Sequence, residues 1–147
     1  LSASGVIISA VLLVPSSLSG SIVVYAMTSF IRSTGAFSGF FTVVSVLIGF
    51  LAGIYMPMGT MPAAMQTIGT LVPASHMAAL FRDSLAGDAL DGVFAGAPAE
   101  TLDSFRAEMG FDLSLGGLQF DAGTSMLYVL GITALFFVIA VMGLRRR

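Results

Sequence analysis

The sequence predicts an all-α integral membrane protein with three transmembrane helices, two short helices at the outer membrane surface and a small α+β cap. Three observations favour this fold class. Apolar residues make up 56% of the 147 residues and charged residues only 10%, whereas a soluble domain carries about a quarter charged residues. Three segments reach the roughly 20 apolar residues that one membrane crossing requires. All eight acidic residues lie between Asp83 and Asp121, so one polar segment interrupts the apolar sequence.

The first two predicted spans cover about residues 5–31 and 36–56. The first contains no charge but has Pro15 near its start, which predicts one long helix with an early kink. The alternative is that residues 1–10 are the tail of a preceding helix and that Pro15-Ser16-Ser17 form a turn. The last span covers residues 123–144 and is followed directly by Arg145–Arg147. The chain begins inside apolar sequence, and we therefore expect it to be the C-terminal piece of a longer polypeptide.

The basic residues predict the orientation in the membrane. Arg32 lies in the short link between the first two spans, and Arg145–Arg147 follow the last one. Positive residues favour the cytoplasmic side, so this link and the C-terminus are expected in the cytoplasm. Residues 57–122 are then outside. We expect a multi-pass protein of the cell membrane, of the prokaryotic inner-membrane type.

Residues 57–87 are apolar, but they contain Pro57, Pro62 and Pro73 as well as charged residues. A fourth crossing here would put the terminal arginines outside, against the charge rule. Prolines at helix starts and ends predict two short helices, 62–72 and 75–87, the second with Ser75 as its N-cap. Each has about 11 residues, too few to span, so the pair is expected to dip into or lie on the outer leaflet.

The acidic segment predicts a small cap. Residues 87–97 suggest a loop, and residues 98–109 an amphipathic helix that stops at Gly110. Strict alternation on both sides of Gly116-Gly117 predicts a hairpin with a two-residue turn. The predicted division of the chain is therefore 1–56 for the first two spans, 57–87 for the short helices, 88–122 for the cap, and 123–147 for the last span and its Arg tail.

One face of the second span carries small residues spaced by three and four. Such faces let helix backbones approach closely in lipid, and the partner helix could belong to this chain or to a second subunit. The packing candidates are Gly35, Gly39, Ser45, Gly49 and Gly53.

Composition also bears on the chemistry. The chain has no Lys and no Cys, and no motif of a hydrolase, metalloprotease or dinucleotide enzyme, so nucleic-acid binding and an enzymatic role are not expected. His76 is the one histidine and lacks an obvious catalytic partner, which favours a structural or gating role. Arg82 and Asp83 mark the water interface, or Arg82 pairs with an acid of the cap. We expect no cofactor and no metal in this chain.

Residues 50–87, FLAGIYMPMGTMPAAMQTIGTLVPASHMAALFRDSLAG, resemble the signature of the ABC-2 type permease family. Residues 29–37, SFIRSTGAF, resemble the cytoplasmic turn between the fourth and fifth spans of that family. The last span fits the family by position only, and the segment 88–121 is longer than in a minimal member. The elements that carry the resemblance are Gly53, Pro57, Pro62, Gln66, Pro73, Arg82 and Gly87.

The resemblance implies a six-span subunit of which this chain holds the last three spans. It implies a second permease subunit, identical or different, and a separate or fused ATPase that carries the ATP and Mg²⁺. It implies export of a hydrophobic or amphipathic substrate, with lipid as the surrounding medium. The short helices would be a re-entrant gate able to tilt about Pro73. A membrane sensor or scaffold whose cap binds a ligand or partner is the alternative. The gate candidates are Pro57, Pro62, Gln66, Pro73, His76 and Arg82.

Overall fold

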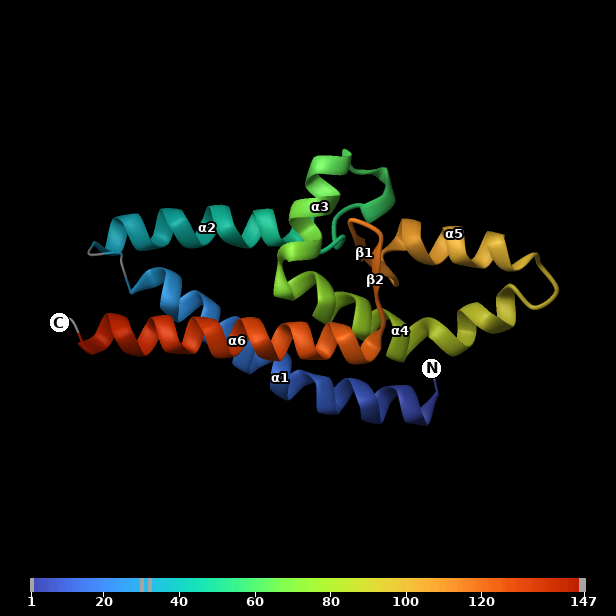
Figure 1. Ribbon diagram of the computed structural model, residues 1–147, viewed down its shortest axis with the longest axis horizontal. Helices are drawn as coiled ribbons and strands as arrows, with labels where there is room; N and C mark the ends of the chain where they lie inside the picture. Colours follow the sequence, from blue (N-terminus) through green and yellow to red (C-terminus); the bar gives the residue numbers. More distant parts are fainter. Residues whose placement is uncertain (1, 30, 32, 146–147) are drawn as a thin grey trace.

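The computed structural model describes residues 2–29, 31 and 33–145, and within this part most residues are helical. In this described part, six α-helices, a short 3₁₀ turn and a hairpin follow one another along the chain (Figure 1). The elements are α1 (Ala3–Thr28), α2 (Thr34–Leu51), the 3₁₀ turn η1 (Met58–Thr60), α3 (Ala63–Leu71), α4 (Pro73–Val93), α5 (Ala99–Met109), β1 (Leu113–Leu115), β2 (Leu118–Phe120) and α6 (Ala122–Arg145).

The helices α1, α2 and α6 are long and apolar enough to cross a membrane, which confirms the prediction of three helices of that length and composition. In Figure 1 they run along the long axis of the molecule. The end of α1, the start of α2 and the C-terminal end of α6 lie at one end, α5 lies toward the other, and the hairpin lies between α3 and α5 beside the start of α6. This layout agrees with a cap on one side and the basic segments on the other. Arg32, Arg146 and Arg147, which carry much of the orientation argument, lie outside the described residues.

Two of the spans pack together around α4, and α2 stands apart from them. Contacts join α1 to α6 and both of them to α4, whereas α2 makes its main contacts with α3. Leu12, Met77, Leu80 and Val129 form a buried cluster where α1, α4 and α6 meet. Most of the span surfaces remain exposed, with only 11–17% of each apolar window buried. That surface is available to lipid or to further helices.

The second span ends earlier than predicted. The helix stops at Leu51 instead of residue 56, because Gly53 takes a left-handed conformation (φ 68°) that turns the chain. Tyr55 then folds back over Gly49 and meets Phe50 edge-on, with 5.1 Å between the ring centroids. The apolar composition of residues 52–56 gave no sign of this turn. Pro15, by contrast, lies inside one continuous α1, as predicted.

The second short helix is longer than predicted at both ends. It begins at Pro73 instead of Ser75, with Val72 as the N-cap, and it continues past Gly87 to Val93. Proline suits the first turn because its missing N–H has no helical partner there. Gly87 is buried inside the helix and costs only about 1 kcal/mol relative to alanine, so it does not end the helix. Residues 88–93, predicted to be loop, are therefore helical.

The rest of the cap follows the sequence prediction. Helix α5 ends at Gly110, which has the left-handed conformation (φ 73°) typical of a helix C-cap. Strands β1 and β2 pair antiparallel, with Leu113 opposite Phe120. Gly116 and Gly117 both have positive φ, as a type I′ two-residue turn requires. A second cluster of Met58, Met61, Ala79 and Leu113 joins the hairpin to α4 and η1.

Candidate functional site

The candidate gate covers the interrupted region after α2 and the first half of α4, and its polar side chains Gln66, His76 and Arg82 each form a separate group of hydrogen bonds. Pro57 and Pro62 stand directly before η1 and α3, where extended backbone precedes each helix. Gln66 ties the same segment together, since its Nε2 donates to the carbonyl oxygens of Met61 (2.8 Å) and Gly59 (3.3 Å). Pro73 opens α4, and Val72 alone separates it from α3, because Val72 is both the C-cap of α3 and the N-cap of α4.

The imidazole of His76 is fully buried where α3, α4, α6 and the hairpin meet. Its Nε2 lies 2.8 Å from the carbonyl oxygen of Thr70, and its Nδ1 lies 3.2 Å from Ser125 Oγ. A carbonyl oxygen only accepts hydrogen bonds, so Nε2 carries the proton and, in the neutral ring, Nδ1 accepts from the Ser125 hydroxyl. Two aromatic rings contact the imidazole on adjacent sides: Phe120 meets it edge-on with 4.8 Å between the centroids, and Tyr128 lies tilted against it at 4.4 Å.

This environment favours the neutral form of His76. Burial lowers its pKa below the ordinary value of 6.5, and the hydrogen bond to Thr70 opposes that shift in part. Tyr128 adds a further tie, because its hydroxyl donates to the carbonyl oxygen of Leu71 at 2.8 Å. The histidine therefore braces α3 and α4 against α6, which is the structural role that the sequence favoured.

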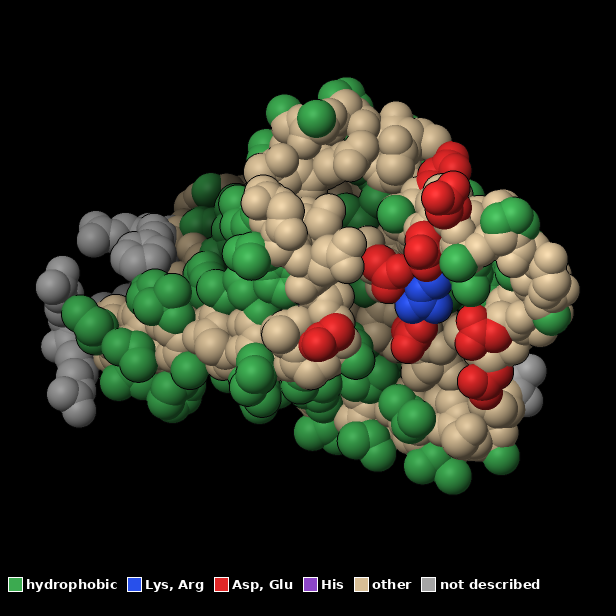
Figure 2. Space-filling model, turned by 45° about the vertical axis from the view of Figure 1, so that its right-hand side comes forward, with side chains coloured by type: hydrophobic (Ala, Val, Ile, Leu, Met, Phe, Trp, Pro, Cys, Tyr) green, Lys and Arg blue, Asp and Glu red, His purple; other side chains and the backbone are tan. Residues whose placement is uncertain are grey.

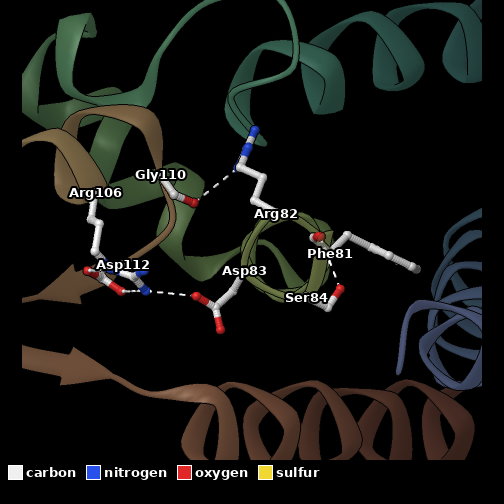
Figure 3. A network of polar contacts seen from close by, with 7 residues as sticks. All are labelled: Phe81, Arg82, Asp83, Ser84, Arg106, Gly110 and Asp112. Atoms are coloured by element: carbon white, nitrogen blue, oxygen red, sulfur yellow. Dashed lines mark hydrogen bonds and ion pairs between the residues drawn. The ribbon is translucent and has the colours of Figure 1, made fainter. Parts of the chain in front are cut away.

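Arg82 binds the carboxyl ends of two helices at once. Its Nη2 donates to the carbonyl oxygens of Ala52 (2.8 Å) and Gly53 (2.7 Å) at the end of α2, and its Nη1 donates to that of Gly110 (3.1 Å), the C-cap of α5 (Figure 3). These carbonyls have no helical partner, and the negative end of each helix dipole attracts a cation. The predicted alternative, in which Arg82 pairs with an acid of the cap, is wrong.

The acid partner belongs to Arg106, which sequence reasoning missed. Its guanidinium bonds Asp112 through Nε (2.9 Å) and Nη2 (3.0 Å) and reaches Asp83 at 2.9 Å. It also lies 5.4 Å from the ring centre of Phe111. These carboxylates raise the pKa of Arg106. The acidic side chains gather over this end of the molecule, around a basic one, while apolar side chains cover much of the rest of the visible face (Figure 2).

The small-residue face of α2 makes little contact inside the chain. A Cβ added at Gly35 or Gly39 would meet nothing within 4 Å, and Ser45 is exposed. Gly49 is covered by the ring of Tyr55, and Gly53 lies beyond the end of the helix. Gly53 thus lies outside α2, and its close neighbours in this chain are the side chains of Met58 and Arg82. Close packing of the remaining face against a second subunit stays a prediction.

Other glycines make the close approaches that this chain does contain. A Cβ at Gly5 of α1 would collide with the carbonyl oxygen of Ser84 in α4, and next to it Ser9 and Ser84 share a hydrogen bond of 2.8 Å. A Cβ at Gly69 of α3 would lie 2.8 Å from the carbonyl oxygen of Leu51. Gly5 belongs to a small-residue face of α1 together with Ser2 and Ser9, which the sequence prediction missed, whereas Gly69 has no small residue three or four positions away.

No protein-family model, curated protein or solved structure matches this chain. Among the described residues, no group of three His, Asp or Glu side chains lies close enough to hold a metal ion.

Proposed function

We propose that the chain is part of the membrane-spanning subunit of an ABC-2 type exporter. It moves a hydrophobic or amphipathic substrate outward, and a cytoplasmic ATPase supplies the energy. The arrangement of residues 52–93 carries the proposal. Between two membrane-spanning helices, on the side of the cap, the chain breaks at Gly53, at Pro62 and at Val72 instead of crossing the membrane again.

Broken helices at this depth suit a barrier at the end of a pathway. Irregular backbone near the membrane is tolerated where protein or water satisfies its polar groups. Here Arg82 satisfies the carbonyls at the end of α2, and the Ser75 hydroxyl donates to the carbonyl oxygen of Leu51 at 3.1 Å. The segment is thus ordered without being a continuous span, as a gate requires.

The layout of the spans supports the same function. The short link after α1 and the C-terminal end of α6 lie together, away from the cap (Figure 1). Four of the six arginines, Arg32 and Arg145–Arg147, lie in these two segments, whereas Arg82 and Arg106 lie among the acidic residues of the cap side. The positive-inside rule therefore puts the two segments in the cytoplasm and the interrupted region outside. An ATPase would then act from the side opposite the gate. The exposed faces of α2 leave room for a second subunit.

The test is purification of the intact protein from its native membrane, followed by reconstitution into lipid vesicles. We expect an ATPase domain or subunit to be present, and ATP hydrolysis to rise when a transported compound is added. Pro73→Ala should lower efflux more than it lowers membrane abundance. A protein with no ATPase partner and no ATP-driven transport would refute the proposal and favour the sensor or scaffold alternative.

A further inference from the structure

A pocket of about 420 Å³ lies between the end of α2, the middle of α4 and α5. This volume falls within the roughly 300–1,000 Å³ typical of small-ligand sites. Its walls are mainly aromatic and aliphatic. The lining residues are Gly53, Ile54, Tyr55, Met56, Pro57, Arg82, Leu90, Phe105, Met109 and Phe111.

Arg82 is the one charged residue among those that line this pocket. A guanidinium has five N–H donors, and the three carbonyl bonds of Arg82 leave two of them. Within the described residues, the ion pairs of this region all belong to Arg106, so no carboxylate neutralises Arg82. The pocket therefore combines an unpaired positive charge and spare donors with apolar walls.

The nearby acids point away from this charge. Asp83 follows Arg82 in α4, but Figure 3 shows the two side chains leaving the helix in different directions, Arg82 toward the end of α2 and Asp83 toward Arg106. Asp83 and Asp112 are both bonded to Arg106. The acidic surface of the cap is thus partly neutralised where it comes closest to the pocket.

The pocket lies where a bilayer would meet water. Ile54 and Tyr55 follow the apolar helix α2 directly and are 65% and 61% exposed. Tyrosine is enriched at the headgroup level of membranes, because its ring is apolar and its hydroxyl polar. Phe105, on the other wall, belongs to α5 of the cap. The two walls therefore belong to the end of a membrane span and to the cap.

We propose that this pocket binds the headgroup of an anionic phospholipid from the surrounding bilayer. The phosphate oxygens accept hydrogen bonds from the two N–H groups of Arg82 that do not bond backbone carbonyls. The upper parts of the acyl chains lie against Tyr55, Leu90 and Phe105. Bound there, the lipid fills the space between the end of α2 and the cap. The site requires only that the chain lies in a bilayer, and it does not depend on transport.

The chain contains no Trp, so a single introduced one can report on the pocket. The Phe105→Trp protein is placed in phosphatidylcholine vesicles that contain either brominated phosphatidylglycerol or brominated phosphatidylcholine, whose bromine quenches Trp on contact. We expect phosphatidylglycerol to bind about five-fold better, the factor for one Lys or Arg near an anionic surface. A Leu127→Trp protein is the control for bulk lipid, because Leu127 lies on α6 and is 70% exposed. It should be quenched equally by both lipids.

Substitutions of the arginines identify the cation. Arg82→Gln in the Phe105→Trp protein should abolish the preference, whereas the matched change Arg106→Gln should keep it. Arg82→Lys, which retains the charge, should keep most of the preference for phosphatidylglycerol, and it serves as the test if the Arg82→Gln protein does not fold. Equal quenching of the Phe105→Trp protein by the two lipids, or no quenching at all, would overturn the proposal without any Arg82 variant. Loss of the preference on adding inorganic phosphate would show a site for free anions and would also overturn it.

Discussion

Gly69 is where α3 comes closest to the end of α2, and we predict that Gly69→Ala destabilises the protein. The new Cβ would lie 2.8 Å from the carbonyl oxygen of Leu51 and 3.1 Å from the terminal methyl of Met58. The Leu51 oxygen is backbone and already accepts the hydrogen bond from Ser75. Met58 is 5% exposed and belongs to the cluster beneath the hairpin. Neither neighbour can withdraw without disturbing other contacts.

The size of the effect follows from three contributions. An extra methyl group in a packed site costs about 1–3 kcal/mol. Weakening the Ser75 hydrogen bond adds about 1 kcal/mol. Alanine stabilises a helix interior by up to about 1 kcal/mol relative to glycine, and this gain offsets part of the loss. We therefore expect Gly69→Ala to lower the free energy of unfolding by about 1–3 kcal/mol.

The assay is reversible unfolding in mixed micelles of increasing denaturing-detergent content, followed by the helical circular dichroism signal. The matched control is Gly131→Ala in α6, where an added Cβ meets nothing within 4 Å. Both substitutions change helix propensity alike, so the difference between them isolates the contact with α2. If the Gly69→Ala protein unfolds at the same detergent content as the Gly131→Ala protein, the described approach of α3 to α2 is wrong.

Three further predictions concern the candidate gate and the cap. Arg82→Gln leaves three backbone carbonyls without a charged donor and should lower the free energy of unfolding by about 2–4 kcal/mol in the same assay. Arg82→Lys should recover only part of this loss, because one ammonium group cannot replace the planar guanidinium. Because burial lowers the pKa of His76, the unfolded chain binds more protons than the folded one below pH 6.5. The free energy of unfolding should therefore be highest above pH 6.5 and fall as the pH drops below it. His76→Gln should flatten this dependence in unfolding curves taken across that pH range. A cysteine at the exposed Ser104, in a chain without native cysteines, should react with a membrane-impermeant maleimide from outside intact cells, and labelling from the cytoplasmic side alone would reverse the topology.

Local signals in the sequence predicted much of the fold. Hydropathy alone locates the three spans, because each is a continuous apolar run. Gly110 marked the end of α5, and Gly116-Gly117 marked the hairpin turn, since both features need backbone conformations that glycine adopts most readily. In each case the residue that determines the structure lies within the element it shapes.

The parts that the sequence did not predict depend on residues that are distant in the chain. Arg106 pairs with Asp83, which lies 23 residues away in the sequence, and Arg82 donates a hydrogen bond to Gly110, which lies 28 residues away. Composition showed that charges were present but not which of them pair. The small residues of α2 indicated that close packing was possible, whereas the close approaches within this chain are made by Gly5 on α1 and Gly69 on α3. Spacing identifies a face, and only the packed structure identifies its partner.

The single residue between α3 and α4 has a mechanical consequence. Proline fixes φ at position 73 and restricts the preceding residue to extended conformations, such as the ψ of 123° observed at Val72. The hydrogen bond from His76 to Thr70 also crosses this joint. With these torsions restricted and the joint bonded across, we expect α3 and α4 to move as one elbow, which argues against the tilt about Pro73 that the family resemblance implied. Any opening at this surface then has to displace the elbow as a unit, with the rotation taken up at residues 52–62 and 94–98, where the chain is not α-helical.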